Sequence, residues 1–374
     1  EKGYLREVGN LVFHSALVVL LFGLAFGKLG GYEGSVLVEE GSGFCNSFQQ
    51  YDTYRNGALA DAGSLTPLCA DLDRFATTYA ANFTPVRFDA DITYSRDLGG
   101  PEAAYTLAVN HPLRVDGVRL YLLGHGFSPR FTITYPDGSQ FTDISAPFLP
   151  DDQATLASSG ALKLPDRPGG SVESDDQLAI EGLFAPTAAV GGDGRLVSVD
   201  PRALNPGVAI VVYRGSIGLD SGAPQNVYRL DQQQIERGAL TEVDSANLLV
   251  GQELTLDDGT VITFDGYRQW AALQLSHDSG QYTVLVAAVL MLAGLMLSLT
   301  VRRRRVWVRV RTDPDARVGQ QGRTVVSVGG LARSDAGGFG SEFAELVTRM
   351  SGRSGPAEPS GRPEPGPPLT PRKD

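Results

Sequence analysis

The sequence predicts a membrane protein in which transmembrane α-helices flank a large β-rich extracytoplasmic domain. Two apolar runs, Leu11–Phe26 and Tyr282–Val301, lie near the ends of the 374 residues. With its mild flanks, each run is close to the roughly 20 residues that a helix needs to cross a bilayer core. Between the runs, short alternating segments are separated by Asp-Gly turns, a pattern typical of antiparallel sheets. The predicted segments are a transmembrane helix with a short cytoplasmic start (1–30), the extracytoplasmic domain (31–280), a transmembrane helix (281–301), a small cytoplasmic domain (302–350) and a disordered tail (351–374).

The first apolar run carries one imidazole. His14 follows Asn10 by four residues, so a helix places both on one face. An ionisable side chain inside a spanning helix is costly and is a candidate functional residue. The alternative is that His14 only hydrogen-bonds a neighbouring helix. The run is longer than the core of a signal peptide and has no clear cleavage site. Because the chain lacks an initiator Met, we expect natural sequence before Glu1.

The second run predicts the orientation. It contains no charge, and Arg302–Arg305 follow it directly, as the positive-inside rule describes. Both chain ends are then cytoplasmic, residues 30–280 lie outside, and the protein is a multi-pass protein of the plasma membrane. Small residues at helical spacing, Gly23 with Gly27 and Gly294 with Ser298, indicate faces on which helices can pack closely.

The central region predicts several strands and turns. Its length fits one large antiparallel domain or two sandwich-like lobes. After the second run, Arg323–Val328 predicts a short strand, and the apolar spacing from Phe339 to Met350 predicts an amphipathic helix. The predicted hairpins are Phe131–Tyr135 with Gln140–Ile144 and Leu254–Leu256 with Val261–Phe264; further predicted elements are strands at Val118–Leu123 and Ala209–Tyr213, a turn at Gly192–Gly194 and a loop at Asp166–Asp176.

Charge and cysteine content exclude some functions. Residues 31–280 carry 33 acidic and 15 basic side chains, a net charge of −18 that would repel nucleic acid. Cys45 and Cys69 are too far apart for a C-x-x-C pair or a compact zinc site. In an oxidising compartment they would most simply form a disulfide. The alternative is two unrelated buried thiols.

The histidines are the candidate functional residues, because no P-loop, G-x-S-x-G, H-E-x-x-H or dinucleotide motif is present. His277 lies just before the second apolar run, where it could meet a membrane-bound ligand or serve only as an interfacial polar group. We expect structural roles for His125, at a strand-to-loop turn, and for His111, before Pro112. Membrane histidines without carboxylate companions suit haem iron better than hard cations.

Four segments of the chain resemble the ResB family, the membrane subunits of the system II machinery for cytochrome c biogenesis. The similarity extends over most of residues 1–350, but the family has two further helices upstream. The segments are GNLVFHSALVVLLFGLAFGKLGGYEGSVLVEEG, which resembles the region of the family's third transmembrane helix, VNHPLRVDGVRLYLLGHGFSP with FTITYPDG in its extracytoplasmic domain, SHDSGQYTVLVAAVLMLAGLMLSLTVRRRRVWVRV at its final helix, and VGGLARSDAGGFGSEFAEL at its cytoplasmic end.

The resemblance implies a role in haem handling. With the membrane protein ResC (CcsA), the protein would move haem b outward and present it to apocytochrome c for thioether attachment, while a thioredoxin-like thiol reductase keeps the acceptor thiols reduced. The family's membrane histidine falls on His14, which would be an axial ligand of the haem iron, and His277 is a second candidate for haem binding. The protein is not expected to be an enzyme alone. The alternative function is a membrane-anchored extracytoplasmic binding module with no haem role.

Overall fold

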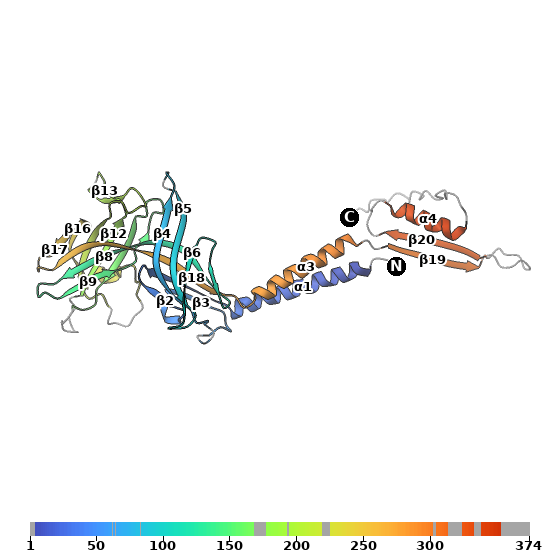
Figure 1. The fold of residues 1–374 in the computed structure, drawn as a ribbon, viewed down its shortest axis with the longest axis horizontal. Coiled ribbons are helices and arrows are strands. Elements are labelled where there is room, and N and C mark those ends of the chain that lie inside the picture. Colours follow the sequence, from blue (N-terminus) through green and yellow to red (C-terminus); the bar gives the residue numbers. More distant parts are fainter. Residues whose placement is uncertain are drawn as a thin grey trace, which may run out of the picture. The chain divides into compact units, whose positions relative to one another are not determined.

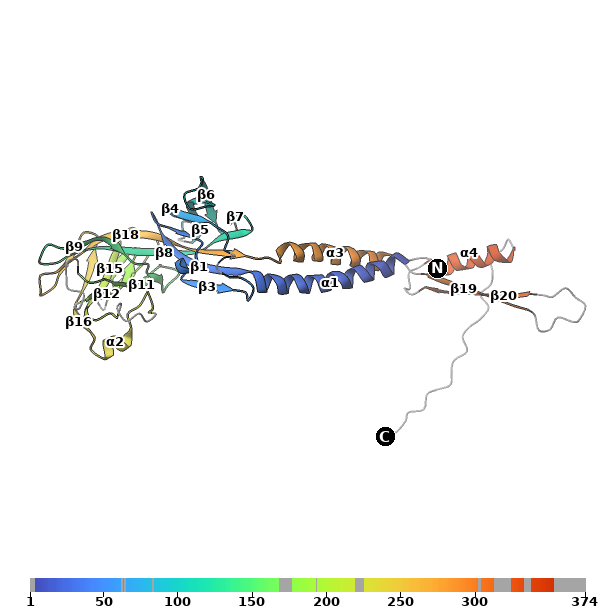
Figure 2. The ribbon, with the colours of Figure 1, turned by 90° about the horizontal axis from the view of Figure 1, so that it is seen from below.

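The computed structural model divides the chain into two compact units (Figures 1 and 2). The β-rich unit is Phe26–Gly280, and the helical unit combines the residues before Phe26 with those from Gln281 onward. The structure describes residues 4–61, 63, 65–82, 84–167, 177–192, 194–218, 225–301, 304–312, 324–332 and 338–352.

Two long apolar helices pack side by side and form most of the helical unit, although the first helix continues past Ala25 into the β-rich unit. They are α1 (Tyr4–Gly30) and α3 (Gln281–Thr300), and both are long and apolar enough to cross a membrane. The backbones touch at two glycines: a Cβ on Gly9 would lie 2.7 Å from the Ser298 nitrogen and 2.8 Å from the Gly294 oxygen. Gly23 meets Thr283 and Val284 at the other end of the contact. Gly294 and Ser298 therefore do form a packing face, but their partner is Gly9.

The outer faces of this helix pair are apolar and uncovered. Only small residues of α1 are buried, namely Gly9, Ala16 and Gly23 at seven-residue spacing. By contrast, Val18 is 67% exposed on α1 and Met296 is 70% exposed on α3. A core helix of a soluble protein would bury such side chains, so this pattern fits helices that an apolar medium surrounds.

The rest of the helical unit is a hairpin with one helix. Strand β19 (Arg304–Thr312) pairs antiparallel with β20 (Thr324–Ala332), and Phe339 and Phe343 of α4 (Phe339–Ser351) pack over Gly330 of β20. The predicted strand and amphipathic helix are confirmed, whereas β19 was not predicted. Arg302, Arg303 and the tail from residue 353 lie outside the described residues, as do Asp193 and residues 168–176 of the predicted turn and loop.

The β-rich unit contains three main sheets among its described residues. A seven-stranded sheet has the order β3-β1-β18-β8-β7, with β17 and β9 at its far end; a four-stranded sheet runs β2-β4-β5-β6, and a five-stranded sheet runs β10-β11-β12-β15-β16. Strands β13 and β14 form a separate hairpin. The bounds are β1 Tyr32–Glu39, β2 Gly43–Cys45, β3 Thr53–Asn56, β4 Cys69–Tyr79, β5 Pro85–Ser95, β6 Glu102–Ala108, β7 Leu113–Val115, β8 Val118–Thr134, β9 Gln140–Ser145, β10 Leu149–Pro150, β11 Ser158–Lys163, β12 Gln177–Ala185, β13 Ala188–Val190, β14 Leu196–Ser198, β15 Gly207–Gly215, β16 Leu240–Leu249, β17 Glu253–Thr255 and β18 Val261–His277, with short helices at Phe48–Gln50 and α2 Gln232–Glu236.

Two 17-residue strands, β8 and β18, run the length of this unit (Figure 1). One half of this strand pair packs on the four-stranded sheet, with Leu120 and Leu275 in the shared core. The other half packs on the five-stranded sheet, with Phe131 and Phe264 in a second core. The unit therefore has two sandwich-like lobes that share their two longest strands. Both predicted hairpins are confirmed, at β8–β9 and β17–β18.

His125 lies in the middle of β8, so the predicted strand-to-loop turn is wrong. Its flanking glycines suggested a turn, but both have extended backbone. Gly126 is opposite Trp270 in β18, and the Trp270 ring lies where a Cβ of Gly126 would be. The buried indole donates to the carbonyls of Phe127 and Phe148, each at 3.2 Å. Gly126 is therefore required for close approach of an aromatic ring.

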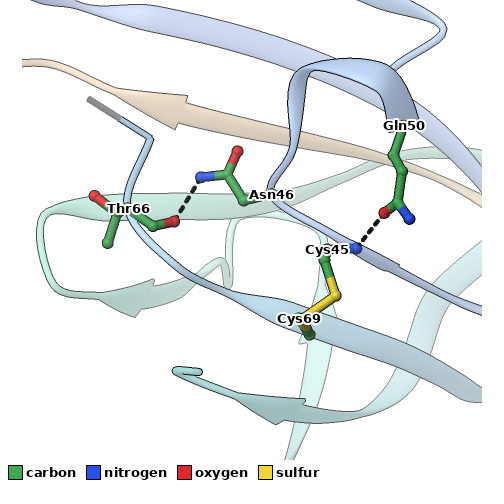
Figure 3. Close-up of a disulfide and its surroundings, with 5 residues drawn as sticks. All are labelled: Cys45, Asn46, Gln50, Thr66 and Cys69. Atoms are coloured by element: carbon green, nitrogen blue, oxygen red, sulfur yellow. Dashed lines mark hydrogen bonds between the residues drawn. A yellow bond between two sulfur atoms is a disulfide. The ribbon is translucent and has the colours of Figure 1, made fainter. Parts of the chain in front are cut away.

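A disulfide joins Cys45 to Cys69 (Figure 3). The two residues are directly opposite each other where β2 pairs with β4. Next to the bridge, the Asn46 amide donates to Tyr32 and to the Thr66 carbonyl. The bridge ties the first strands of the unit to its four-stranded sheet.

Replacing Gly126 by Ala should destabilise the β-rich unit by about 1–3 kcal/mol, because the added methyl group displaces the buried Trp270 ring. Gly124→Ala is the matched control, since its Cβ would meet only the Ala272 Cβ, at 3.9 Å. Thermal unfolding of the full chain in detergent, followed by tryptophan emission, measures both. Equal midpoints for the two variants would contradict this account of Gly126.

Removing the disulfide with the double substitution Cys45→Ser and Cys69→Ser should cost about 3 kcal/mol, the entropy of a loop of this length in the unfolded chain. Reductant should lower the unfolding midpoint of the parent chain and leave that of the double variant unchanged. Two free thiols, found by mass spectrometry in protein from an oxidising compartment, would be inconsistent with the bridge.

Candidate functional site

His14 occupies an exposed, apolar stretch of α1 in the helical unit. It stands two residues before the buried Ala16, about 200° around the helix, and therefore faces away from α3. Its Nδ1 lies 2.8 Å from the Asn10 carbonyl oxygen, one turn earlier. A carbonyl only accepts hydrogen bonds, so Nδ1 carries a proton, and in the neutral ring Nε2 is then the nitrogen with the lone pair. The hydrogen bond thus orients the imidazole so that its neutral form offers Nε2 as a ligand.

The surroundings of His14 suit an apolar ligand. Leu17, Val18 and Leu21 are exposed on the turns that follow it. The Phe13 ring contacts the imidazole edge to face, with centroids 5.2 Å apart. A shallow hollow of about 440 Å³ beside it is lined by Tyr4, Glu7, Val8, Asn10, Leu11 and His14. These residues fit a haem held by one axial imidazole. His14 is the one histidine that the sequence places in the helical unit.

His277 is the last residue of β18, in the β-rich unit. Its Nδ1 lies 3.1 Å from the Gly117 carbonyl oxygen, and its ring stacks on Tyr32 with centroids 5.4 Å apart. By the same argument, Nδ1 donates, and in the neutral ring Nε2 is the nitrogen with the lone pair. The hydrogen bond and the stack together fix the orientation of the His277 ring.

The other two histidines, His111 and His125, differ from His14 and His277 in their surroundings. His111 is exposed in the turn before Pro112 and stacks on Tyr105, with an interplanar angle of 3°. His125 is sandwiched between aromatic rings, with centroid distances of 4.9 Å to Phe75 and 5.1 Å to Phe88. Its Nδ1 is buried and has no hydrogen-bond partner among the described residues. Burial lowers the pKa of His125 to about 4, so the ring is neutral at physiological pH.

Two cavities meet at His125, and the sequence did not reveal them. One of about 350 Å³ lies beside Phe75, Leu123 and Trp270. The other, of about 430 Å³, lies beside Tyr79, Asn82 and Leu156. Phe88, His125 and Gln153 line both. The two glycines around His125 were the sequence signal, but they are as typical of a turn as of close packing.

The structure brings together only one pair of the predicted site residues, Cys45 and Cys69. His14 belongs to the helical unit and His277 to the β-rich unit. Within the described part of the chain, no three His, Cys, Asp or Glu side chains gather as a metal site.

Comparison with known proteins identifies relatives along most of the chain. Cytochrome c biogenesis protein CcsB of Synechococcus sp. (strain WH7803) is 24% identical over 354 residues, which are 94% of this chain and 63% of the relative. The CcsB protein of Synechococcus sp. (strain CC9311) is 26% identical over 59% of this chain and 53% of its own length. The CcsB protein of Synechococcus sp. (strain RCC307) is also 26% identical, over 52% of this chain and 40% of its own length. The chain therefore spans less than two thirds of these relatives.

The family assignment rests on a longer match. The family model described as the ResB-like family matches residues 1–344, which include both apolar helices and the whole β-rich unit. The family and the two uncovered apolar helices indicate a membrane location. The match also confirms the resemblance of the four sequence segments. The chain belongs to the ResB-like family.

Proposed function

We propose that this protein is a haem-handling subunit of the system II machinery for cytochrome c biogenesis. Helices α1 and α3 cross the plasma membrane, the β-rich unit lies outside, and His14 is an axial ligand of haem b within the bilayer. The similarity to proteins named cytochrome c biogenesis protein CcsB supports a role in this process. The geometry of His14 supports its proposed role as a haem ligand.

The hydrogen bond from His14 to Asn10 carries the proposal. Histidines that bind metals almost always donate their other ring N–H to a carbonyl or carboxylate, which fixes the tautomer and the ring orientation. Here the backbone carbonyl of Asn10 does this at 2.8 Å. When bound, haem supplies an iron atom that needs such a nitrogen and a macrocycle that needs an apolar environment. The exposed face of α1 offers both.

The arrangement implies partners. His14 faces away from α3, and the helical unit has no other histidine. A second ligand for the same haem would therefore come from a partner such as ResC (CcsA), and His277 would take part in haem binding separately, in the β-rich unit. Apocytochrome c would receive the haem outside, with its thiols kept reduced by a thioredoxin-like protein.

A His14→Gln variant should insert normally but copurify with about tenfold less haem, because it keeps polarity and loses the ligand nitrogen. Maturation of c-type cytochromes should fail with it. The measurement is the Soret absorbance of protein purified after co-expression with ResC, beside haem staining of cytochromes. His111→Gln is the matched control. Wild-type haem content in the His14→Gln variant would make His14 a packing residue and favour a binding module without a haem role.

Asn10→Ala should keep haem binding within about twofold of the parent, because the acceptor for His14 is the backbone carbonyl and not the Asn10 side chain. The same Soret measurement checks this. A loss as large as that of His14→Gln would show that the amide side chain takes part and would overturn the backbone argument.

The proposed orientation predicts opposite labelling of two exposed positions. Leu98→Cys, in the β-rich unit, should react with a membrane-impermeant maleimide on intact cells, since Leu98 is 86% exposed. Ser341→Cys, on the exposed face of α4, should react only after the cells are permeabilised. The native cysteines are bonded and give no background. Labelling of Ser341→Cys from outside would reverse the topology.

A further inference from the structure

The centre of the β-rich unit has the features of a ligand site with no part in the haem proposal. His125 stands in mid-strand between two cavities of about 350 and 430 Å³, each large enough for a side chain or a small ligand. Both lobes contribute walls, Phe88 from the four-stranded sheet's lobe and Gln153 from the segment after β10. The three residues that line both cavities form a wall common to the two.

Two backbone irregularities border these cavities. The register of β8 against β18 shifts at a β-bulge, where Leu123 has no cross-strand partner in β18. Leu123 is 57% exposed and lines the smaller cavity. Leu156, in the wall of the second cavity, is buried with φ of 52°, a conformation that is costly for a bulky residue. Bulges and strained residues are frequent beside binding sites, where they aim side chains.

The tautomer of His125 decides what the site can recognise. His14 and His277 each donate from Nδ1 to a carbonyl, which leaves Nε2 as a lone pair for a metal. The buried Nδ1 of His125 has no acceptor, so a proton there would be an unsatisfied buried donor. The proton is better placed on Nε2, the other ring nitrogen of a side chain that lines both cavities. His125 therefore offers a hydrogen-bond donor and not a metal ligand.

The remaining walls indicate an uncharged ligand. His125 is the one ionisable histidine among the described residues that line the cavities, and it is neutral at physiological pH; none of the others is Asp, Glu, Lys or Arg. Aromatic and aliphatic side chains dominate, and the polar groups Asn82, Thr84 and Gln153 are neutral donors and acceptors of the kind that bind peptide groups. The carboxylates of a haem or the charge of a nucleotide would be buried here without a partner, which is costly.

We propose that the two cavities at His125 form a binding site for an extended, uncharged polypeptide segment. Its aromatic or aliphatic side chains enter the cavities, and a backbone carbonyl accepts a hydrogen bond from Nε2–H of His125. The existence of the site rests on the cavity alone. The identity of the polypeptide as a segment of the cytochrome to be matured rests on the proposed function.

The test uses the full chain in nanodiscs with Trp307→Phe, which leaves Trp270 at the cavity as the sole tryptophan. The probe is the capped pentapeptide acetyl-Ser-Phe-Val-Phe-Ser-amide, and the control probe carries Asp in place of both Phe residues. The Phe peptide should change Trp270 emission saturably, and the Asp peptide should not. The same titration in a His14→Ala background should be unaltered, which separates this site from haem handling.

Two variants locate the binding. His125→Phe keeps the aromatic stack but removes the donor, and should weaken binding about three- to tenfold. Leu123→Asp puts a carboxylate at an exposed position of the wall and should abolish saturation. Leu98→Asp, exposed elsewhere in the unit, is the matched control and should bind as the parent does.

Three outcomes would overturn the proposal. Unaltered affinity in both His125→Phe and Leu123→Asp would place binding elsewhere. Binding of phenylalanine amide as tightly as the pentapeptide would make the site one for a small aromatic ligand. A Soret shift on hemin addition that is present in the His14→Ala background and lost with His125→Phe would make it a haem site.

Discussion

The pairing of β8 with β18 is the interaction on which the β-rich unit depends. These two strands share a ladder from Val118–His277 at one end to Thr134–Val261 at the other, and each half contributes side chains to a different core. Neither lobe closes without them. The ladder is regular except at two bulges, and the bulge at Leu123 lies where the strands pass from one core to the other. That passage is also where Trp270, Gly126 and His125 meet.

Hydrogen-bond partners distinguish the histidines better than their sequence contexts do. A neutral imidazole has one donor nitrogen and one acceptor nitrogen, and a fixed acceptor nearby decides which is which. Backbone carbonyls fix His14 and His277 in one form, and the lack of an acceptor favours the opposite form for His125. The neutral ring therefore offers Nε2 as an acceptor at His14 and His277 and as a donor at His125.

Local signals in the sequence predicted much of the fold. Asp-Gly turns between alternating runs located both hairpins at the far end of the long strands, and apolar length located α1 and α3. The extent of β8 was not predictable, because Gly124 and Gly126 resemble a turn until their cross-strand partners are known. Strand β19 was missed for another reason: its arginines matched the positive-inside pattern, which hid their alternation with valine. The cavities at His125 involve residues from distant strands, so no single stretch of sequence contains them.

The position of β18 in its sheet has a consequence for how the protein is made. It lies between β1 and β8, yet it is the last strand of the unit to leave the ribosome. Until it arrives, β1 and β8 each have an unpaired edge, and such edges invite pairing with other chains. Strands that pair across nearly the whole unit, as Tyr32 does with His277, also form slowly because a long loop must close first. Completion of the sheet therefore coincides with synthesis of α3, so folding of the β-rich unit and delivery of the final apolar helix are coupled events in biosynthesis.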